Sequence, residues 1–568
     1  MINTFRKLTK HSRTWLYGFL ALLCITPILF FAAIMINNDS NLYMIIGLFL
    51  MTLSLFFIPF LFFRKKTAFI INSIYIFFSI FELYSLYLYK LPFSSSLAFV
   101  LFQTNKFEAI EFLQSNLPWL FIYLFICGVY LFLVIKYVEN EFLFSKKYKK
   151  IILLSTIAIY MGMFAYCLNL NKSFIQKHES KLFWSHSLHC YSLKFKKIYP
   201  VNIFYGFSAG IKNYSDLKIF NSNIDTFTFN ATTKEKINER EIYVFIIGET
   251  ARASNFSING YHRNTTPLLK NTKNIYSYTD VLSQASLTTI SLPILLTRSD
   301  AINFELYKKE KTVVDAFKEA GFNTYWIGNQ SFYNNFIVSI CNRVDNAYMT
   351  LKDFDYTGSL DETMFPFLNE ILNKKEQKQF IVIHTLGSHF RYNLRYSSEY
   401  RKFEPDLSGL KDYQQILNPK NKGQLLNSYD NSIAYTDYFL TNTISLLEKE
   451  QAISYLFYIS DHGENIYDDD DNLFGHGSTK PTKNELHVPL ILWLSNRYIE
   501  MFPHKENSIK RNINKKKSSE IVFHSLIDMG NIDMNNLDID KSISDTLLTS
   551  DSIRYFRNIE GEIIEIKY

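Results

Sequence analysis

The sequence predicts a chain of two parts, a membrane part of five helices followed by a largely parallel α/β domain. The chain has 568 residues, too many for one ordinary soluble domain, and 48% are hydrophobic and 17% aromatic. Its long apolar segments lie within the first 168 residues. After residue 241, short β-branched and aromatic runs alternate with helical patterns, which is typical of α/β folds.

Five segments are long and apolar enough to form helices that cross a hydrocarbon core about 30 Å thick. The first two contain no charged residue, and the third contains Asn72 and Glu82. A cleavable signal peptide is the less favoured interpretation of the first segment, because a second apolar segment follows closely. The predicted spans are Trp15 to Ile36, Leu42 to Phe63, Ala68 to Tyr89, Pro118 to Ile135 and Ile151 to Leu168.

The distribution of Lys and Arg predicts the orientation of these spans. Basic residues precede the first span, follow the second and separate the fourth from the fifth, whereas the segment NNDSN between the first two has none. Positive charge favours the inner side, so the N-terminus is expected inside. Five crossings then place everything after Leu168 outside. In a double-membraned bacterium this predicts a multi-pass inner-membrane protein with a periplasmic domain.

The overall charge and the cysteines exclude some classes of protein. The formal net charge is +7, and the excess Lys and Arg lie largely beside apolar segments, so we expect no nucleic-acid partner. Three of the five cysteines lie in the apolar segments. Cys190 and Cys341 remain as one conceivable pair, and the sequence leaves that pairing open.

The predicted domains are a transmembrane domain over residues 1–168, a connector with a membrane-interface helix over 169–240, and a catalytic domain over 241–568. In the connector, Trp184 and other aromatic residues alternate with lysines, which suits either a membrane interface or an amphipathic helix packed on the domain. Glu82, inside a span, is a functional candidate by default. A structural role is favoured, because a carboxylate near the end of a span can reach the interface.

Acidic and histidine side chains follow three predicted strands of the α/β part. Glu249 follows EIYVFIIG, His384 and His389 follow QFIVI, and Asp461 and His462 follow ISYLFYIS. Ligands in such folds gather beyond the carboxyl ends of the strands, and Asp, Glu and His are ligands suited to zinc. A metal site is therefore favoured over unrelated structural residues at the three strand ends. His476 in FGHG belongs to the same group, whereas the acidic run Tyr467 to Asp471 is expected to be a solvated loop.

Two hydroxyl positions are candidates for a nucleophile. Thr288 and Thr289 precede an apolar stretch that predicts a helix, whose free N–H groups favour an anion.

In the loop before the fourth span, Thr104 and Glu108 would share one face of a helix, and spacing alone favours an ordinary polar surface there.

The motifs GETARASNFSINGYHRNTTP, TTISLP, YWIGNQ, HTLGSH, SDHGE and GHG give the chain a nearly end-to-end resemblance to the membrane phosphoethanolamine transferases of Gram-negative bacteria. This group includes the polymyxin-resistance enzymes and belongs to the alkaline phosphatase and sulfatase superfamily. The resemblance implies transfer of phosphoethanolamine from phosphatidylethanolamine to a cell-envelope glycolipid, lipid A or core oligosaccharide. A phosphoethanolamine-threonine intermediate forms at a zinc site, and diacylglycerol is released.

The resemblance also implies roles for individual residues. The zinc ligands fall on Glu249, Asp461, His462 and the nucleophile, which is Thr288 when counted back from the proline of TTISLP, with Thr289 as runner-up. The remaining positions are His389 and His476, which bind phosphate or a second zinc, and Thr104 and Glu108, which hold the donor headgroup.

The chain also departs from the polymyxin-resistance members. Two cysteines that bracket the nucleophile there correspond to Gln284 and Ile294, and an asparagine of the donor site corresponds to Val100. The acceptor therefore stays open. A sulfatase activity is disfavoured, because the text from Ser291 to Leu295 lacks the arginine of a C/S-x-P-x-R motif. A glycerol-phosphate transferase and an inactive membrane scaffold remain the alternatives.

Overall fold

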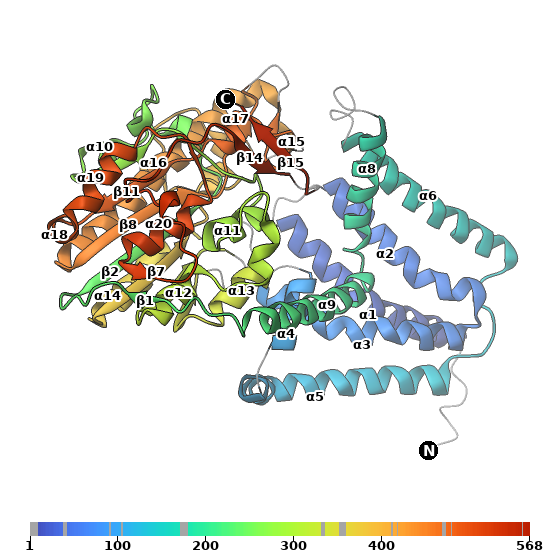
Figure 1. Ribbon diagram of the computed structural model, residues 1–568. Coiled ribbons are helices and arrows are strands. Elements are labelled where there is room, and N and C mark those ends of the chain that lie inside the picture. Colours follow the sequence, from blue (N-terminus) through green and yellow to red (C-terminus); the bar gives the residue numbers. More distant parts are fainter. Residues whose placement is uncertain are drawn as a thin grey trace. The chain divides into compact units, whose positions relative to one another are not determined.

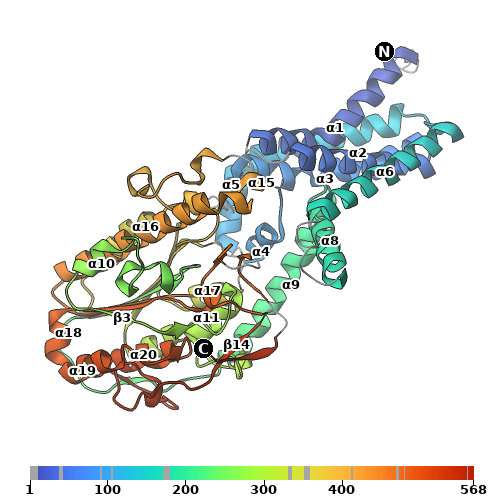
Figure 2. The ribbon, with the colours of Figure 1, turned by 90° about the horizontal axis from the view of Figure 1, so that it is seen from above.

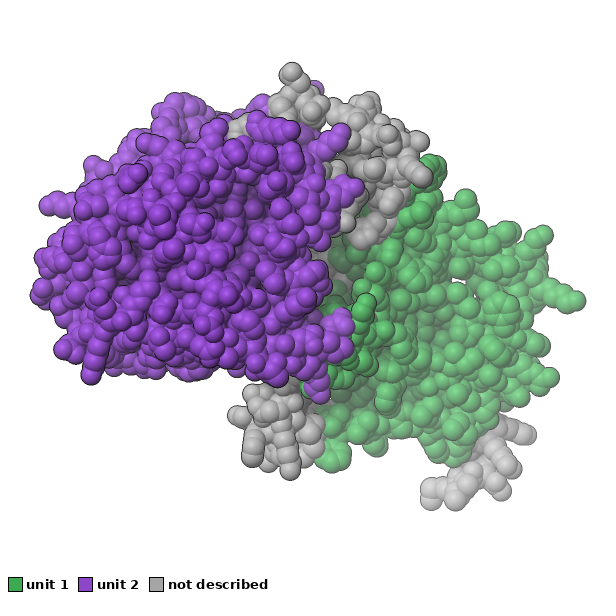
Figure 3. All heavy atoms as spheres, viewed as in Figure 1, with its two compact units in different colours: residues 1–215 green, residues 216–568 purple. Residues whose placement is uncertain are grey.

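The computed structural model describes two compact units, residues 1–215 and 216–568, each with its own core (Figure 3). The described residues are 10–37, 42–89, 92–103, 106–170, 180–330, 335–350, 359–410, 413–416, 418–468, 473–478, 480–558 and 561–567.

The first unit is helical, and five of its helices are long and apolar enough to cross a membrane by length and composition. The shorter α4 and α8, and α9, which runs on into the second unit, complete it (Figure 1). Exposed Phe, Leu and Ile side chains along the spans leave an apolar surface suited to lipid. The helices are α1 (Lys10–Asn37), α2 (Leu42–Phe62), α3 (Lys65–Tyr89), α4 (Ser95–Gln103), α5 (Lys106–Tyr137), α6 (Lys146–Leu170), α8 (Ser180–Phe195) and α9 (Val201–Ile224).

Glu82, a carboxylate buried in the first unit, has hydrogen-bond partners. Glu82 of α3 accepts hydrogen bonds from the Phe93 backbone N–H at 3.0 Å and from Asn202 Nδ2 of α9 at 2.7 Å. These contacts join α3 to α9 and to the segment before α4, which agrees with a structural role for this carboxylate. All five cysteines are free thiols, so the structure holds no Cys190–Cys341 bond.

A seven-stranded sheet forms the centre of the second unit, in the order β3-β11-β8-β2-β7-β5-β6. The pairs β8–β2, β2–β7, β7–β5 and β5–β6 are parallel. The predicted fold class, five apolar helices followed by a mostly parallel α/β domain, is thus confirmed. The strands are β2 (Glu241–Gly248), β3 (Ile275–Tyr278), β5 (Asn323–Gly328), β6 (Asn346–Met349), β7 (Lys378–His384), β8 (Ile453–Ser460) and β11 (Leu490–Leu494).

Strand β11 differs from the parallel pattern, because it runs antiparallel to both β8 and β3. Two strands that follow each other in the chain can pair in parallel only through a crossover connection, which is usually a helix packed on the sheet. The segment between β8 and β11 instead carries loops, the short pair β9 (Asn465–Ile466) and β10 (Phe474–Gly475), and the one-turn helix α17 (Lys483–Leu486).

Helices cover both faces of the sheet and form a hydrophobic core with each face. Successive residues of β2 therefore point alternately into the two cores. Figure 2 shows α10 and α16 on one side of the sheet and α19 and α20 on the other. The helices of the first face are α10 (Pro267–Asn271), α14 (Phe365–Asn373), α15 (Tyr413–Ile416) and α16 (Lys422–Lys449); those of the second are α11 (Thr288–Leu296), α12 (Val313–Glu319), α13 (Asn335–Cys341), α18 (Asn496–Met501), α19 (Pro503–Asn512) and α20 (Ile521–Met529).

Short strands and turns complete the second unit. Among them, β14 and β15 form an antiparallel hairpin near the C-terminus. The short strands are β1 (Thr232–Thr233), β4 (Val281–Leu282), β12 (Lys517–Ser518), β13 (Ile532–Asp533), β14 (Arg554–Arg557) and β15 (Ile563–Ile566). The 3₁₀ turns are η2 (Ala253–Asn255), η3 (Ser257–Asn259), η4 (Phe304–Lys308), η5 (Asp361–Met364), η6 (Tyr392–Leu394), η7 (Ser398–Tyr400), η8 (Leu407–Gly409), η9 (Pro419–Asn421) and η10 (Ile539–Lys541).

Candidate metal and nucleophile site

The site begins where the central strands end. In the parallel register Gly248 of β2 pairs with Ser460 of β8, so the next residues, Glu249 and Asp461, emerge side by side. Thr250 follows with φ of 60°, in the left-handed region that few non-glycine residues adopt. Its N–H donates to Asp461 Oδ1 at 3.1 Å, and its hydroxyl donates to Glu249 Oε1 at 2.7 Å. These two bonds hold the turn and orient both carboxylates.

Glycine is required at one position beside this turn. Gly387, in the loop after β7, has φ of 50°, and a Cβ there would lie 2.7 Å from the backbone oxygen of Glu249. The loop therefore approaches Glu249 closely, and the Ser388 N–H donates to that same oxygen at 2.9 Å.

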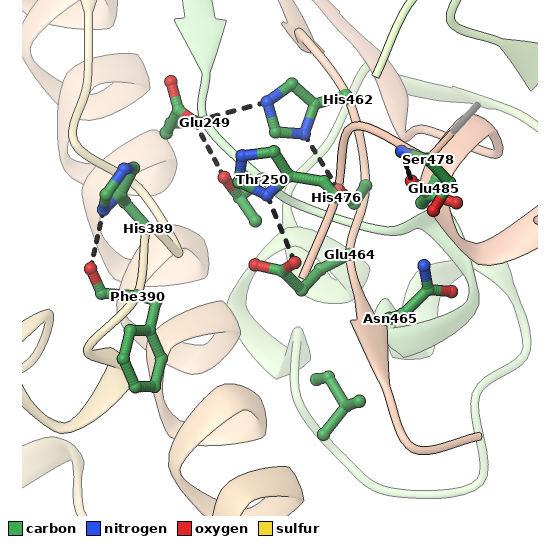
Figure 4. A network of polar contacts seen from close by, with 12 residues as sticks. Glu249, Thr250, His389, Phe390, His462, Glu464, Asn465, His476, Ser478 and Glu485 are labelled. Carbon is green, nitrogen blue, oxygen red and sulfur yellow. Dashed lines mark hydrogen bonds and ion pairs between the residues drawn. The ribbon is translucent and has the colours of Figure 1, made fainter. Parts of the chain in front are cut away.

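Glu249, Asp461 and His462 form a buried triad whose ligand atoms lie within 4.8 Å of one another. Figure 4 shows Glu249 and His462 of this triad. His462 Nδ1 contacts the Gly463 carbonyl oxygen at 2.8 Å, so that nitrogen carries the proton and donates. His462 Nε2 then faces the carboxylates, 3.3 Å from Asp461 Oδ2 and 3.6 Å from Glu249 Oε1. A neutral imidazole nitrogen turned toward two carboxylates is a ready set of metal ligands.

Thr288 is the first residue of α11, and its side chain reaches the triad. Its Oγ1 lies 3.2 Å from Glu249 Oε2, 3.3 Å from Glu249 Oε1 and 3.4 Å from His462 Nε2. Thr289, the next residue, is exposed. Packing of the apolar face of α11, with Leu292 and Leu295 in the core, sets this rotation of the helix.

The triad fits a divalent cation. Asp461 Oδ2 is buried without a hydrogen-bond partner among the described residues. Burial raises the pKa of Glu249 well above its ordinary value, and the charge of Asp461 raises it further. Two facing, buried carboxylates are costly unless a cation compensates them. Two carboxylates, an imidazole and a hydroxyl form a donor set suited to zinc.

Two further histidines lie in the same region (Figure 4). The ring of His476 lies 4.2 Å from that of His462, and its Nδ1 lies 3.2 Å from Glu464 Oε1. Burial alone lowers the pKa of His476, but the charge and hydrogen bond of Glu464 outweigh burial and raise it to about 9. His389 contacts the Phe390 carbonyl oxygen through Nδ1 at 2.7 Å, and burial lowers its pKa.

The structure does not place several other positions singled out by the sequence in this site. Thr104 falls outside the described residues, and the side chains of Glu108 and Val100 do as well. Gln284 accepts a hydrogen bond from the Ala301 N–H at 3.0 Å, and Ile294 is buried in the core. A hydrogen bond at Gln284 and apolar packing at Ile294 thus stand at the two positions that a disulfide would join.

Sequence reasoning missed Gln330 as a site residue. It follows β5 within YWIGNQ, and its Nε2 donates to the Thr385 carbonyl at 2.9 Å and to Glu249 Oε2 at 3.4 Å. A polar residue just after a buried strand was the available signal. Sequence reasoning also gave no role to Glu464, the last residue of the motif SDHGE, which contacts His476.

Asp468, in the solvated loop predicted for Tyr467 to Asp471, is exposed, but it also has specific partners that the sequence did not predict. Its Oδ2 accepts from Arg252 Nη1 at 2.6 Å and from the Ile466 N–H at 2.9 Å. Arg252 is only 3% exposed and also contacts the Glu464 carbonyl oxygen at 3.4 Å. The pair thus joins the turn after Glu249 to the loop after His462.

We expect Asp468→Ala to destabilise the protein by about 2–3 kcal/mol, because it leaves the buried Arg252 guanidinium without its counter-charge. Thermal unfolding of the full chain in detergent micelles measures this. Asp540→Ala, at an exposed position, is the matched control and should stay within about 0.5 kcal/mol of wild type. Equal stability of the two variants would contradict the role given to Asp468.

A parallel α/β domain that brings a helix-terminal hydroxyl to carboxylate and histidine ligands at its strand ends has the architecture of the sulfatase-like proteins. Residues 241–532 match the family model described as Sulfatase. The chain belongs to this family.

Several curated relatives of the chain are phosphoethanolamine transferases. The chain is 31% identical over 304 residues to phosphoethanolamine transferase EptA of Escherichia coli (strain K12), covering 52% of this chain and 54% of that protein. It is 31% identical over 274 residues to the Kdo(2)-lipid A phosphoethanolamine 7''-transferase of Salmonella typhimurium, covering 46% of each chain. The matches thus span about half the length of these relatives.

Two solved structures resemble the chain. The C-terminal periplasmic domain of EcEptC from Escherichia coli, in complex with Zn, is 25% identical with a TM-score of 0.53, and covers 59% of this chain and 95% of that one. The integral membrane lipooligosaccharide phosphoethanolamine transferase A (EptA) of Neisseria meningitidis is 22% identical with a TM-score of 0.51, and covers 93% and 98%. The second likeness shows that the fold extends to the membrane part.

Proposed function

We propose that the protein transfers phosphoethanolamine from phosphatidylethanolamine to a cell-envelope glycolipid by way of Thr288. The observation that carries the proposal is Thr288 Oγ1, which lies within 3.4 Å of both Glu249 and His462 at the first turn of α11. The phosphoethanolamine transferases among the relatives support the group transferred.

In this proposal Glu249, Asp461, His462 and Thr288 hold one zinc ion. When bound, the zinc supplies positive charge that favours the deprotonated threonine and stabilises the phosphoryl oxygens. Thr288 Oγ1 forms a bond to phosphorus while the bond from phosphorus to the diacylglycerol oxygen breaks. His476, whose pKa is raised, donates a proton to that leaving oxygen, and His389 contacts the phosphoryl group. The acceptor oxygen then displaces Thr288, and His476 regains its proton.

A second zinc between His389 and His476 is the alternative for these two residues, and metal analysis of the purified chain separates the two cases. One zinc per chain supports binding of phosphate by the histidines. Two zinc ions, reduced to one in His389→Ala, support the second site.

The membrane part suits lipid substrates. Donor and acceptor both carry acyl chains, and five helices are suited to span a bilayer. With the N-terminus cytoplasmic, as the Lys and Arg distribution favours, the 241–568 domain lies in the periplasm, the location named for the domain of the Escherichia coli relative. Thr104 and Glu108 then belong to the donor site.

The names of the relatives support a proposal for the acceptor. One is named Kdo(2)-lipid A phosphoethanolamine 7''-transferase, so we propose lipid A or core oligosaccharide as acceptor, with polymyxin resistance as the consequence of a reduced negative charge. Mass spectrometry of lipid A and core from cells with and without the gene tests this. An added phosphoethanolamine mass that depends on the gene supports it, and unchanged glycolipids contradict it.

The nearest competing function is glycerol-phosphate transfer at the same threonine. Purified protein given labelled phosphatidylethanolamine or labelled phosphatidylglycerol separates the two. Label on Thr288 from the first lipid alone supports the proposal, whereas label from the second lipid alone supports the competitor.

A further inference from the structure

His384, the last residue of β7, is a buried polar side chain that the proposed mechanism leaves without a task. It is 1% exposed, and neither ring nitrogen has a hydrogen-bond partner among the described residues. Buried polar atoms in native proteins are nearly always paired, and each unpaired one is costly. A side chain kept only to fill space would be better served by an apolar residue of similar size.

The strand register places His384 beneath the metal-ligand triad. It pairs with Ile247 of β2, and Ile247 pairs with Ile459 of β8. Because side chains alternate along a strand, Glu249 and Asp461, each two residues further on, emerge on the same face of the sheet. The imidazole therefore lies on the face of the sheet from which the two carboxylates emerge. Burial lowers its pKa to about 4, and the charge of Asp461 opposes that shift.

Trp326 of β5 adds a second unpaired donor beside this histidine. Its ring lies 6.0 Å from the His384 ring in an edge-on arrangement, and its Nε1 is buried without a partner among the described residues. The indole nitrogen lies 3.1 Å from the position a Cβ would take at Gly328, the residue that pairs with His384 across β5 and β7. Polar groups of two neighbouring strands, β5 and β7, thus lie close together.

One side-chain oxygen of Asp461 also lacks a hydrogen-bond partner among the described residues. Its Oδ1 accepts from the backbone N–H groups of Thr250 and His462, whereas its Oδ2 has no partner among the described residues. An oxygen that binds a cation with one lone pair still has another to be satisfied. Partners of this kind orient a metal-binding carboxylate and tune its affinity.

We propose that His384 is a positioning residue for Asp461, to which it is linked by one buried water that the Trp326 N–H also holds. In this arrangement His384 donates through the water to Asp461 Oδ2 and keeps that carboxylate turned toward the cation. The inference rests on the proposed metal site, which Glu249, Asp461 and His462 form. It adds two residues, His384 and Trp326, that touch neither substrate nor metal.

The test is zinc affinity of the full chain, purified metal-free in detergent micelles and titrated against a chromogenic chelator. His384→Phe keeps an aromatic ring but removes both nitrogens, and we expect zinc to bind about 10- to 100-fold more weakly. The metal-free variant should unfold near the wild-type temperature, because an aromatic ring of similar size fills the same space. His384→Gln, whose amide can bind the same water, should recover most of the affinity. Trp326→Phe should cause a smaller loss.

His524 of α20 offers a matched control. It is 2% exposed, but its Nδ1 accepts from the Asp538 N–H at 3.2 Å, so it is a buried histidine with a partner. His524→Phe should lower the unfolding temperature and leave zinc affinity unchanged. Zinc affinity within twofold of wild type in His384→Phe would overturn the inference and leave the metal site standing. A parallel fall of stability and affinity that His384→Gln does not restore would overturn it too. A wild-type chain that binds no zinc would overturn both proposals.

Should His384→Phe fail to fold, Trp326→Phe carries the test. Its affinity loss supports the inference, and unchanged affinity contradicts it.

Discussion

Thr288→Ala should reduce phosphoethanolamine transfer by about 10³-fold or more, because the variant lacks the oxygen that forms the bond to phosphorus. Its effect on stability should be small, within about 1 kcal/mol, since the hydroxyl makes only long contacts of 3.2–3.4 Å and alanine favours a helix. The measurement is release of diacylglycerol from labelled phosphatidylethanolamine, together with thermal unfolding. Mass spectrometry of the stalled wild-type chain should place the modification on Thr288.

Thr289→Ala is the matched control, one residue along the same helix turn. Thr289 is exposed, so this variant should keep activity within a few-fold of wild type. Reversal of the two results would transfer the nucleophile to Thr289. Full activity in both variants would favour a different nucleophile, and no activity in the wild-type chain would favour an inactive scaffold.

Removal of zinc has the second largest expected effect. A chelator should abolish transfer, and the metal-free chain should be less stable, because Glu249 and Asp461 then face each other in a buried place without a compensating cation. Returning zinc at about a thousandfold excess over its Kd should stabilise the fold by about 4 kcal/mol. Calorimetry with and without zinc measures this difference.

Glu249→Gln and Glu241→Gln form a matched pair at opposite ends of β2. Glu249→Gln removes a ligand and one of two facing charges, so zinc binding should weaken strongly while the metal-free chain keeps or gains stability. Glu241 contacts Tyr243 and Lys378, and its variant should bind zinc normally. Equal zinc binding by both variants would contradict the assigned ligand.

Local patterns predicted most of the architecture. Apolar runs near 20 residues correspond to α1, α2, α3, α5 and α6, and β-branched runs correspond to β2, β5, β7 and β8. These patterns are reliable because burial acts on every residue of such a segment. These patterns did not predict that β11 is antiparallel. The direction of a strand depends on the connection that precedes it and not on the composition of the strand.

The grouping of Glu249, Asp461 and His462 was also predictable, because the carboxyl ends of neighbouring parallel strands lie at one edge of the sheet. Contacts made by loops were not. Asp468 belongs to an acidic run that resembles a solvated loop, yet it pairs with Arg252, more than 200 residues earlier in the chain. No spacing rule relates residues so far apart.

The amino-acid sequence alone determined the apolar helices, the α/β class and the chemical types gathered at the strand ends, because periodicity and residue type act locally. Only the tertiary structure decided which hydroxyl faces the triad. The rotation of α11 depends on how Leu292 and Leu295 pack in the core, and that packing brings Thr288 rather than Thr289 to Glu249. Packing likewise brought Gln330 to Glu249, and strand pairing set His384 opposite Ile247, two residues before Glu249.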